Sequence, residues 1–414
     1  MRGILFWVLV VALKIYVYAS LMRLFKRPLY RRLAIGGAVL SFVVLGLGLY
    51  TAFVGFSGGI QHPTVFSNFS LALMVSMFVC ELFLVPFFLL DDLVGLGKWT
   101  YQSTWKKTPK EEQPGRRKFL KKAGAILGML PFSSFLYGIT AGKYRFTVHE
   151  QQLFFEDLPA AFDGFRLAQI SDIHSGSFDS QDAVRRGIQL LQEQQADVIL
   201  FTGDLVNSYA SEIEPFIKDF QQLTAPYGKF AVLGNHDYPM HRRMFDNEEH
   251  GQKNLAKIKE HHASMDFNLL LNDSTRLEKD GAHIQLVGVE NWGRSRHFPK
   301  AGDLDAATAA CAEDDFIVLM SHDPTHWEDK VKSYEKHVHL TLSGHTHGMQ
   351  MGIDLPAFKW SPIKYVYKHW AGLYEEAGRR LYVNRGFGFL GFAGRVGVFP
   401  EITVLELKKG TQVG

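Results

Sequence analysis

Cysteine is scarce in this chain, with only Cys80 and Cys311 among 414 residues. Cys80 lies in an apolar run and Cys311 lies far along the chain, so a disulfide between them is not expected. Two cysteines also exclude a metal site built on thiolates. Any metal that the chain binds must therefore be held by histidine, aspartate, asparagine or glutamate.

A strong charge of either sign is also missing. The formal net charge is +3, from 45 basic and 42 acidic residues, which gives no reason to expect a nucleic-acid partner. Internal repeats and low-complexity segments are lacking as well. The sequence does have length enough for two domains, 33 phenylalanines, and an N-terminal third that is far more apolar than the remainder.

Four apolar runs precede residue 143, at about residues 4–22, 33–56, 69–90 and 123–142. Each has about the ~20 residues that a helix needs to cross a bilayer. Residues 1–142 are therefore predicted to form a bundle of about four transmembrane helices. Lys14 interrupts the first run and Glu81 lies in the third. Lys14 could reach the interface or pair with Glu81, or each side chain could simply face the bundle.

Basic residues are divided unevenly among the loops. Residues 23–32 contain five Lys or Arg, residues 57–69 contain none, and residues 91–122 contain nine. By the positive-inside rule, the first and third loops are cytoplasmic. With four spans, residues 143–414 then lie outside the cytoplasm. We therefore expect a multi-pass protein of a bacterial cytoplasmic (inner) membrane with an extracytoplasmic domain.

The third loop ends in Gly-Arg-Arg-Lys-Phe-Leu-Lys at residues 115–121. This stretch resembles a twin-arginine export signal, Ser/Thr-Arg-Arg-x-Phe-Leu-Lys, although Gly115 replaces the usual Ser or Thr. The resemblance implies the twin-arginine export machinery as a partner, and that route carries folded proteins. The alternative is a basic flank of a membrane anchor. A small-x-small cleavage site is poorly formed near residues 139–141, so the fourth helix is expected to remain as an anchor.

Residues 143–414 read as a separate domain of short apolar strands that end in polar loops. Strands are expected at about residues 165–170, 198–201, 230–233, 284–289, 316–320, 337–342, 381–383 and 402–407. Helices near 180–194 and 212–223 connect the first three, beginning with a β-α-β unit. Ligand sites of such sheets form beyond the carboxyl ends of the strands. The polar loop residues there are Asp172, His174, Asp204, Asn235, His236, Asp237, His322, His345 and His347.

The last of these loops is Ser-Gly-His-Thr-His-Gly, at residues 343–348. It follows an alternating strand in which Val338, Leu340 and Leu342 are expected to share one face. Its two glycines let the backbone turn tightly after the strand. Two imidazoles on such a turn can each reach a different metal ion.

The mixture of carboxylate, amide and imidazole groups without thiolate suits manganese, iron, zinc or magnesium. Two divalent ions about 3.5–4 Å apart are the usual catalyst of phosphoester cleavage. The candidate residues therefore point to hydrolysis of a phosphoester.

Five blocks carry a resemblance to a known family. They are Asp172-x-His174, Gly203-Asp204-x-x-Asn207, Gly234-Asn235-His236-Asp237, the single His322, and Gly344-His345-x-His347. In this order they resemble the signature of the calcineurin-like metallophosphoesterases. Residues 158–164, 344–350, 360–362 and 382–388 also resemble a membrane-anchored bacterial branch of that family, in keeping with the twin-arginine pattern.

The resemblance implies a fold and a set of roles. The fold would be a four-layer α/β/β/α sandwich of two mixed sheets flanked by helices, spanning residues 143–414. One divalent ion would be held by Asp172, His174 and His347. The other would be held by Asn235, His322 and His345, with Asp204 bridging both. His236 would stabilise or protonate the leaving oxygen, Asp237 would orient its ring, and a hydroxide bridging the ions would attack.

Arg385 follows a predicted strand end and is a candidate for clamping a phosphate. A structural salt bridge is the alternative for an arginine in such a loop.

The function expected from these features is a membrane-anchored, dinuclear metal-dependent phosphoesterase. Its substrate would be a phosphomonoester, phosphodiester or pyrophosphate, in an envelope or lipid-linked molecule. One alternative is a UDP-2,3-diacylglucosamine pyrophosphatase of lipid A synthesis, which would have to face the cytoplasm. The others are a non-catalytic membrane metal-binding scaffold and a transporter-like protein that acts through its spans.

Overall fold

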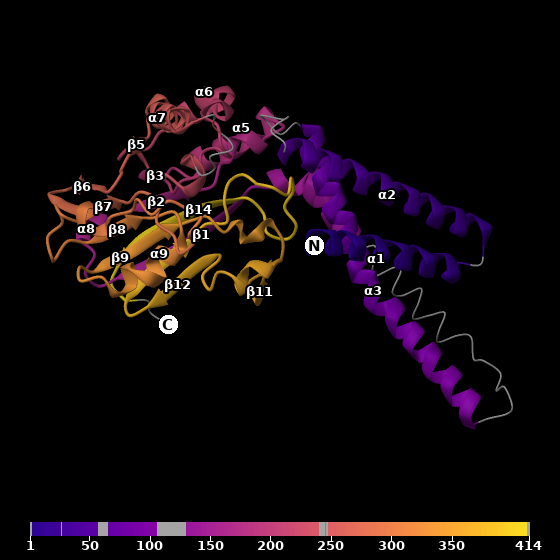
Figure 1. The fold of residues 1–414 in the computed structure, drawn as a ribbon. Helices are drawn as coiled ribbons and strands as arrows, with labels where there is room; N and C mark the ends of the chain where they lie inside the picture. Colours follow the sequence, from indigo (N-terminus) through magenta and orange to yellow (C-terminus); the bar gives the residue numbers. More distant parts are fainter. Residues whose placement is uncertain are drawn as a thin grey trace. The chain divides into compact units, whose positions relative to one another are not determined.

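The computed structural model describes residues 2–25, 27–56, 65–105, 130–239, 245 and 247–411. The chain divides into two units, residues 1–140 and residues 141–414, each with its own internal contacts (Figure 1). The twin-arginine-like stretch at residues 115–121 lies outside the described residues.

The first unit contains three long apolar helices, α1 (Arg2–Leu24), α2 (Pro28–Phe56) and α3 (Val65–Trp105). Among the described residues, these are the helices long and apolar enough to cross a membrane. They expose apolar side chains such as Leu5, Leu33 and Phe53, as helices facing lipid do. The first three predicted spans, residues 4–22, 33–56 and 69–90, lie within these three helices. Most of the fourth predicted span, residues 130–140, is helical, and its beginning at residues 123–129 lies outside the described residues.

Helix α3 continues well beyond the predicted third span, which ended at residue 90. Asp91 and Asp92 close the apolar run, but an aspartate inside a helix costs at most about 0.7 kcal/mol relative to alanine and does not stop the helix. The third apolar run therefore predicted the part of α3 that can lie in lipid, but it did not predict where α3 ends.

A buried polar cluster joins the three helices. Lys14 Nζ of α1 lies 2.8 Å from Glu81 Oε2 of α3 and 2.6 Å from Ser41 Oγ of α2. All three residues are buried. The hypothesis that Lys14 pairs with Glu81 is confirmed.

The second unit contains two six-stranded mixed sheets. In spatial order the first sheet is β1 (Thr147–Phe155), β14 (Glu401–Lys409), β2 (Arg166–Ile170), β3 (Val198–Phe201), β4 (Lys229–Ala231) and β5 (Asn268–Leu269). The second is β12 (Gly372–Glu376), β13 (Arg379–Val383), β9 (Val338–Ser343), β8 (Ile317–Met320), β7 (Ala282–Gly288) and β6 (Asp273–Lys279). Strands β2, β3 and β4 run parallel, as do β7, β8, β9 and β13.

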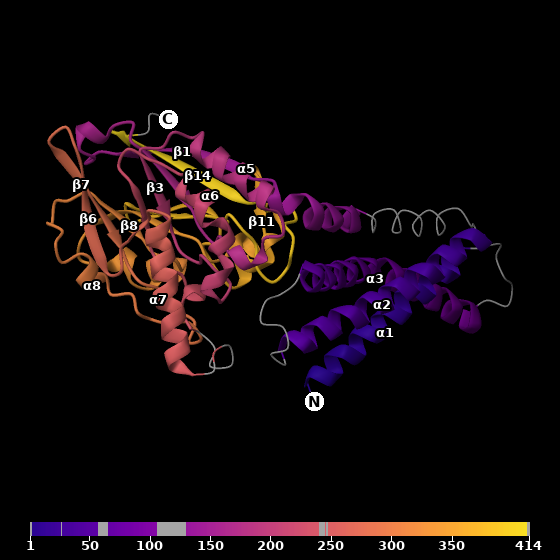
Figure 2. The same ribbon diagram turned by 90° about the horizontal axis from the view of Figure 1, so that it is seen from above.

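Three apolar cores separate four layers. Strand β3 shows the pattern, because Val198 and Leu200 face the core between the sheets while Ile199 and Phe201 face the helices. Those helices are α5 (Gln181–Gln192), α6 (Ile217–Gln221) and α7 (Glu248–Ser264), which cover the first sheet (Figure 1 and Figure 2). Helices α8 (Leu304–Ala307) and α9 (Pro324–Asp329) pack on the second sheet through the third core. The predicted α/β/β/α sandwich is confirmed.

One detail of strand β9 differs from expectation. Leu340 and Leu342 face the core between the sheets, but Val338 belongs to the outer core with α8 and α9. The pairing of β8 with β9 shifts register between Ile317 and Val318. Because of that irregularity, Val338 lies on the opposite face of the strand from Leu340 and Leu342. The alternation of apolar residues in the sequence does not predict this.

Candidate metal centre

The predicted ligands lie in loops that follow parallel strands. Asp172 and His174 follow β2, Asp204 follows β3, and Asn235 follows β4 in a short 3₁₀ turn. On the second sheet, His322 follows β8, and His345 and His347 follow β9. The carboxyl ends of parallel strands meet at one edge, so residues 175 positions apart in the chain become neighbours. Two groups able to hold a metal ion result: Asp172, His174 and His347, and Asp204, His322 and His345.

The loops are held in unusual backbone conformations. Five of the candidate residues have positive φ, namely Asp172 (52°), His174 (47°), Asp204 (63°), His345 (71°) and His347 (50°). Such conformations cost of order 1–3 kcal/mol each and persist only where the surrounding structure imposes them. The gathering of five in one place is typical of a functional site.

A glycine allows two of the loops to approach each other. A Cβ on Gly234 would lie 2.2 Å from Oδ1 of Asp204, a distance that no real side chain tolerates. The Gly-Asn-His-Asp block therefore needs its glycine so that the backbone can pass directly beside the Asp204 carboxylate.

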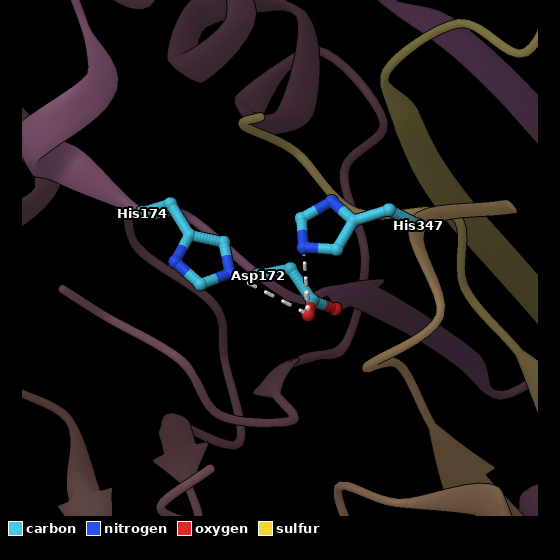
Figure 3. Close-up of side chains that lie close together, drawn as sticks. All are labelled: Asp172, His174 and His347. Atoms are coloured by element: carbon cyan, nitrogen blue, oxygen red, sulfur yellow. Dashed lines mark ion pairs between the residues drawn. The ribbon is translucent and has the colours of Figure 1, made fainter. Parts of the chain in front are cut away.

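The first group is buried, and its histidines point toward one carboxylate (Figure 3). Nε2 of His347 lies 3.3 Å and Nε2 of His174 lies 3.9 Å from Oδ1 of Asp172. Nδ1 of His174 lies 3.2 Å from the carbonyl oxygen of Val206, to which it can donate its proton, leaving Nε2 free to bind a cation. Among the described residues, neither His174 Nε2 nor His347 Nε2 has a hydrogen-bond partner. Buried nitrogens of this kind fit a metal ion.

The second group has the same design. Nε2 of His322 lies 3.2 Å from Oδ2 of Asp204, and its Nδ1 lies 2.7 Å from the carbonyl oxygen of Thr202. Nδ1 of His345 lies 3.3 Å from His322 Nε2. Asn235 is buried in the loop after β4. The backbone carbonyl again fixes which ring nitrogen faces the site.

Asp204 connects the two groups. Its Oδ2 atom lies 3.5 Å from Nε2 of His174 and 3.2 Å from Nε2 of His322. Its Oδ1 atom accepts a hydrogen bond of 2.7 Å from the backbone N–H of His236. One carboxylate therefore faces a histidine from each group.

Burial and charge shift the protonation of these residues in opposite directions. Burial raises the pKa of Asp172 to about 6 and lowers the pKa of His174 to about 3. Burial would also lower the pKa of His322, but the adjacent Asp204 carboxylate outweighs it and raises that pKa. The buried carboxylates thus draw a positive charge into the site. Divalent cations would supply that charge without a proton, so this donor set fits them.

His236 lies beside these groups and is only partly buried. Its ring centroid is 5.0 Å from that of His174, and its Nδ1 lies 2.9 Å from the carbonyl oxygen of Asn207. The expectation that Asp237 orients this ring is wrong. The Asp237 carboxylate instead accepts hydrogen bonds of 2.9–3.0 Å from the backbone N–H groups of Gly234, Asp204 and Leu205. Asp237 fixes the loop that carries Asp204, and burial raises its pKa to about 7.

Arg385 is not available to clamp a phosphate. Its side chain is buried, with Nη1 2.6 Å from Glu401 Oε2 and Nε 2.7 Å from Asp354 Oδ2. The alternative of a structural salt bridge is confirmed, because two carboxylates already neutralise and hold the guanidinium.

Two neighbours of the metal groups carried no signal in the sequence. The buried Arg395 places Nη2 3.2 Å from Nδ1 of His347, and the hydroxyl of Tyr367 lies 2.8 Å from Nε2 of His345. Both residues lie well past the last motif. Only the fold brings them back to the site.

Two family models match the sequence. The calcineurin-like phosphoesterase model matches residues 165–349, and a model described as the probable transmembrane domain of calcineurin-like phosphoesterases matches residues 1–143. The uncharacterized metallophosphoesterase YkuE of Bacillus subtilis is 29% identical over 61% of this chain and 82% of its own length. A transmembrane protein with metallophosphoesterase domain from Danio rerio is 27% identical over 66% of this chain and 60% of its own length. The phosphodiesterase YaeI of Escherichia coli is 26% identical over 70% of this chain and 98% of its own length.

Proposed function

This chain belongs to the calcineurin-like phosphoesterase family and is a metal-dependent phosphoric ester hydrolase with an N-terminal transmembrane domain; on that premise, we propose that two divalent ions act together in its reaction. The bond cleaved is that of a phosphomonoester, phosphodiester or pyrophosphate in an envelope or lipid-linked substrate. The nitrogen and oxygen donors suit manganese, zinc, iron or magnesium.

The position of Asp204 is the observation that carries this proposal. Its carboxylate lies within 3.5 Å of a histidine from each ligand group, as a bridge between two cations requires. Asp172, His174 and His347 would hold one ion. Asn235, His322 and His345 would hold the other.

Two divalent ions supply the charge that offsets the developing negative charge on phosphate, and they lower the pKa of water. The protein contributes the proton for the leaving oxygen through His236. The carbonyl of Asn207 holds Nδ1 of that ring, so Nε2 is the nitrogen that can exchange a proton with the substrate. Asp237 acts indirectly, because its hydrogen bonds to backbone N–H groups keep the Asp204 loop in place.

Kinetics of the full-length chain in detergent with Mn²⁺ and bis-p-nitrophenyl phosphate test the proposal. His236→Ala is expected to lower kcat by about 10²–10⁴, the usual contribution of a general acid. Asp204→Ala is expected to abolish activity. His283→Ala is the matched control, because His283 pairs with Asp315 at the start of β7, away from the carboxyl ends of the strands. Wild-type rates in Asp204→Ala, or no Mn²⁺-dependent hydrolysis by the unsubstituted chain, would contradict the proposal.

We also propose that the second unit lies outside the cytoplasm, at a bacterial inner membrane. The support is the distribution of Lys and Arg, which are concentrated in residues 23–32 and 91–122 and absent from residues 57–69. A periplasm-specific reporter fused after residue 414 should be active. Activity of a cytoplasmic reporter there would reverse the topology. If Arg116→Lys with Arg117→Lys prevents the reporter from becoming active, the twin-arginine machinery is the route.

A further inference from the structure

Exposed apolar side chains of the second unit gather in one short segment. Among its described residues, every large apolar side chain that is exposed lies between residues 349 and 366. These side chains, which we call the apolar patch, and their exposed fractions are Met349 (47%), Ile353 (44%), Leu355 (58%), Phe358 (55%), Tyr365 (75%) and Val366 (72%). A cluster of this kind on an otherwise polar surface marks an interaction site.

The apolar patch is built on a defined structure. Three of its residues lie on a hairpin of β10 (Ile353–Leu355) and β11 (Phe358–Trp360), Met349 lies in the preceding 3₁₀ turn, His347–Gln350, and two lie at the end of the next 3₁₀ turn, Pro362–Tyr365. The hairpin belongs to neither large sheet. A two-stranded hairpin is only marginally stable alone, so its anchoring to the rest of the unit matters.

Two polar side-chain contacts contribute to that anchoring, in addition to backbone hydrogen bonds between residues 350–352 and Val396. Oδ2 of Asp354 lies 2.7 Å from Nε of the buried Arg385. Oγ of Ser361 donates a hydrogen bond of 2.7 Å to the carbonyl oxygen of Gly348. Asp354 and Ser361 therefore turn inward and are satisfied, while the apolar side chains of the patch face solvent. This is the reverse of the arrangement expected for a surface that meets only water.

The segment is attached to the metal centre at both ends. It begins two residues after His347, and it is followed by Tyr367, whose hydroxyl lies 2.8 Å from Nε2 of His345. The chain thus connects the apolar patch to the candidate metal ligands on both sides.

The charges on this segment are positive. Lys359, Lys364 and Lys368 are exposed, and the one acidic residue between 349 and 368 is Asp354, which is paired with Arg385. Lys368 lies 3.7–3.9 Å from Glu376 and Glu328, so Lys359 and Lys364 carry most of the unbalanced charge. Apolar and aromatic side chains beside lysines are the composition of protein surfaces that bind anionic bilayers.

We propose that the apolar patch, together with Lys359 and Lys364, docks the second unit onto an anionic phospholipid surface. The apolar side chains enter the boundary between headgroups and acyl chains, and the lysines meet lipid phosphates. The described part of the chain includes three helices long and apolar enough to cross a membrane, so the patch acts at a high effective lipid concentration and needs little affinity of its own. This inference rests on the proposed function. If the second unit is docked in this way, its substrate is a phosphoester at the membrane surface.

A fluorescent label at the hairpin tests docking without reference to activity. Cys80 and Cys311 are buried, so the label NBD can be placed on Phe358→Cys of the full-length chain in nanodiscs. The emission should shift to the blue and be quenched by doxyl lipids, and more strongly when phosphatidylglycerol is added to phosphatidylcholine. The control label on Glu313→Cys, at an exposed site before β8, should show neither effect. Equal signals at both positions would overturn the proposal. A signal that depends on protein concentration instead of lipid would also overturn it, and would indicate that the patch binds another copy of this chain.

A pair of substrates tests the consequence for catalysis. Phosphatidyl-p-nitrophenol in vesicles and soluble bis-p-nitrophenyl phosphate share the same leaving group and differ in location. Leu355→Ser with Phe358→Ser should lower kcat/KM for the lipid by at least about fivefold, since two apolar side chains no longer enter the bilayer. Hydrolysis of the soluble substrate should not change. Equal rates on the lipid would overturn the docking proposal, whereas failure of the unsubstituted chain on both substrates would overturn the proposed function and leave the label to decide docking.

Discussion

Arg395 is a buried cation behind a metal-ligand candidate. Its Nε and Nη2 atoms donate hydrogen bonds of 2.9 and 2.5 Å to the carbonyl oxygen of Gly388, and Nη2 also donates one of 3.1 Å to the carbonyl oxygen of Gly386. A Cβ on Gly386 would lie 3.0 Å from Arg395, from Asp172 and from His347 at once. The guanidinium therefore joins the loop after β13 to the ring of His347 and fixes the position of that ring.

Arg395→Lys should weaken one metal site and spare the other. Lysine keeps the charge but cannot reproduce the fork of hydrogen bonds. Loss of a group that positions a ligand costs about 10–100-fold in metal affinity, and only the ion held by Asp172, His174 and His347 should be affected. Calorimetric titration of the metal-free, full-length chain with Mn²⁺ measures both affinities.

The matched control for that experiment is Arg379→Lys. Arg379 is also buried and donates to the carbonyl oxygens of Val331, Tyr334 and Lys336, but it lies at the start of β13. It should leave both affinities unchanged. If Arg395→Lys weakens both ions equally, or behaves as the control does, Arg395 does not position His347.

The sequence predicted ligand types better than supporting roles. Six of the seven predicted ligands form the two groups, and Asn235 lies in the loop after β4. Each follows a strand, and the strands can be recognised from short apolar runs. The roles of Asp237 and Arg385 were mistaken for a different reason. Their partners are backbone amides and carboxylates from remote segments, and no motif spacing encodes such contacts.

At the scale of helices, the Lys14–Glu81 pair is a buried ion pair between α1 and α3 of the first unit. A charged side chain in a membrane helix is costly unless it is paired. Here the ammonium group meets both a carboxylate and the hydroxyl of Ser41, so each of the three helices contributes one partner. The pair thus fixes how the helices are rotated against each other.

Lys14→Met alone should destabilise the protein strongly, because it leaves Glu81 buried without a counter-charge. Removal of one partner of a buried ion pair costs about 3–5 kcal/mol. Adding Glu81→Leu to the same chain should recover most of the lost stability, since apolar residues suit this environment. Thermal unfolding of purified full-length variants in detergent measures both effects. A double variant no more stable than Lys14→Met would show that the helices need the polar cluster itself.

Elements were easier to predict than their exact ends. Long apolar runs identified α1, α2 and α3, and short apolar runs identified most strands. The extension of α3 to Trp105 and the register shift beside Val338 were not foreseen. The end of α3 was missed because the two aspartates that close the apolar run do not end the helix. The register shift was missed because an irregular strand pairing leaves no signal in the composition.

At the scale of the whole molecule, three apolar cores explain why the second unit has four layers. Each sheet is apolar on both faces, so one face packs on the other sheet and the opposite face packs on helices. This much follows from strands such as β3 and β8, in which every residue is buried. The pairing of β14 between β1 and β2 could not be read from the sequence, because it joins strands about 240 residues apart.

The central claim is that two ions, bridged by Asp204, act together. The most direct measurement is a titration of metal-free, full-length chain with Mn²⁺ that follows bound metal and hydrolysis of bis-p-nitrophenyl phosphate in the same samples. We expect two ions per chain, activity that rises only as the second ion binds, and weaker binding with no activity in Asp204→Ala. Full activity with one ion or none bound would contradict the account.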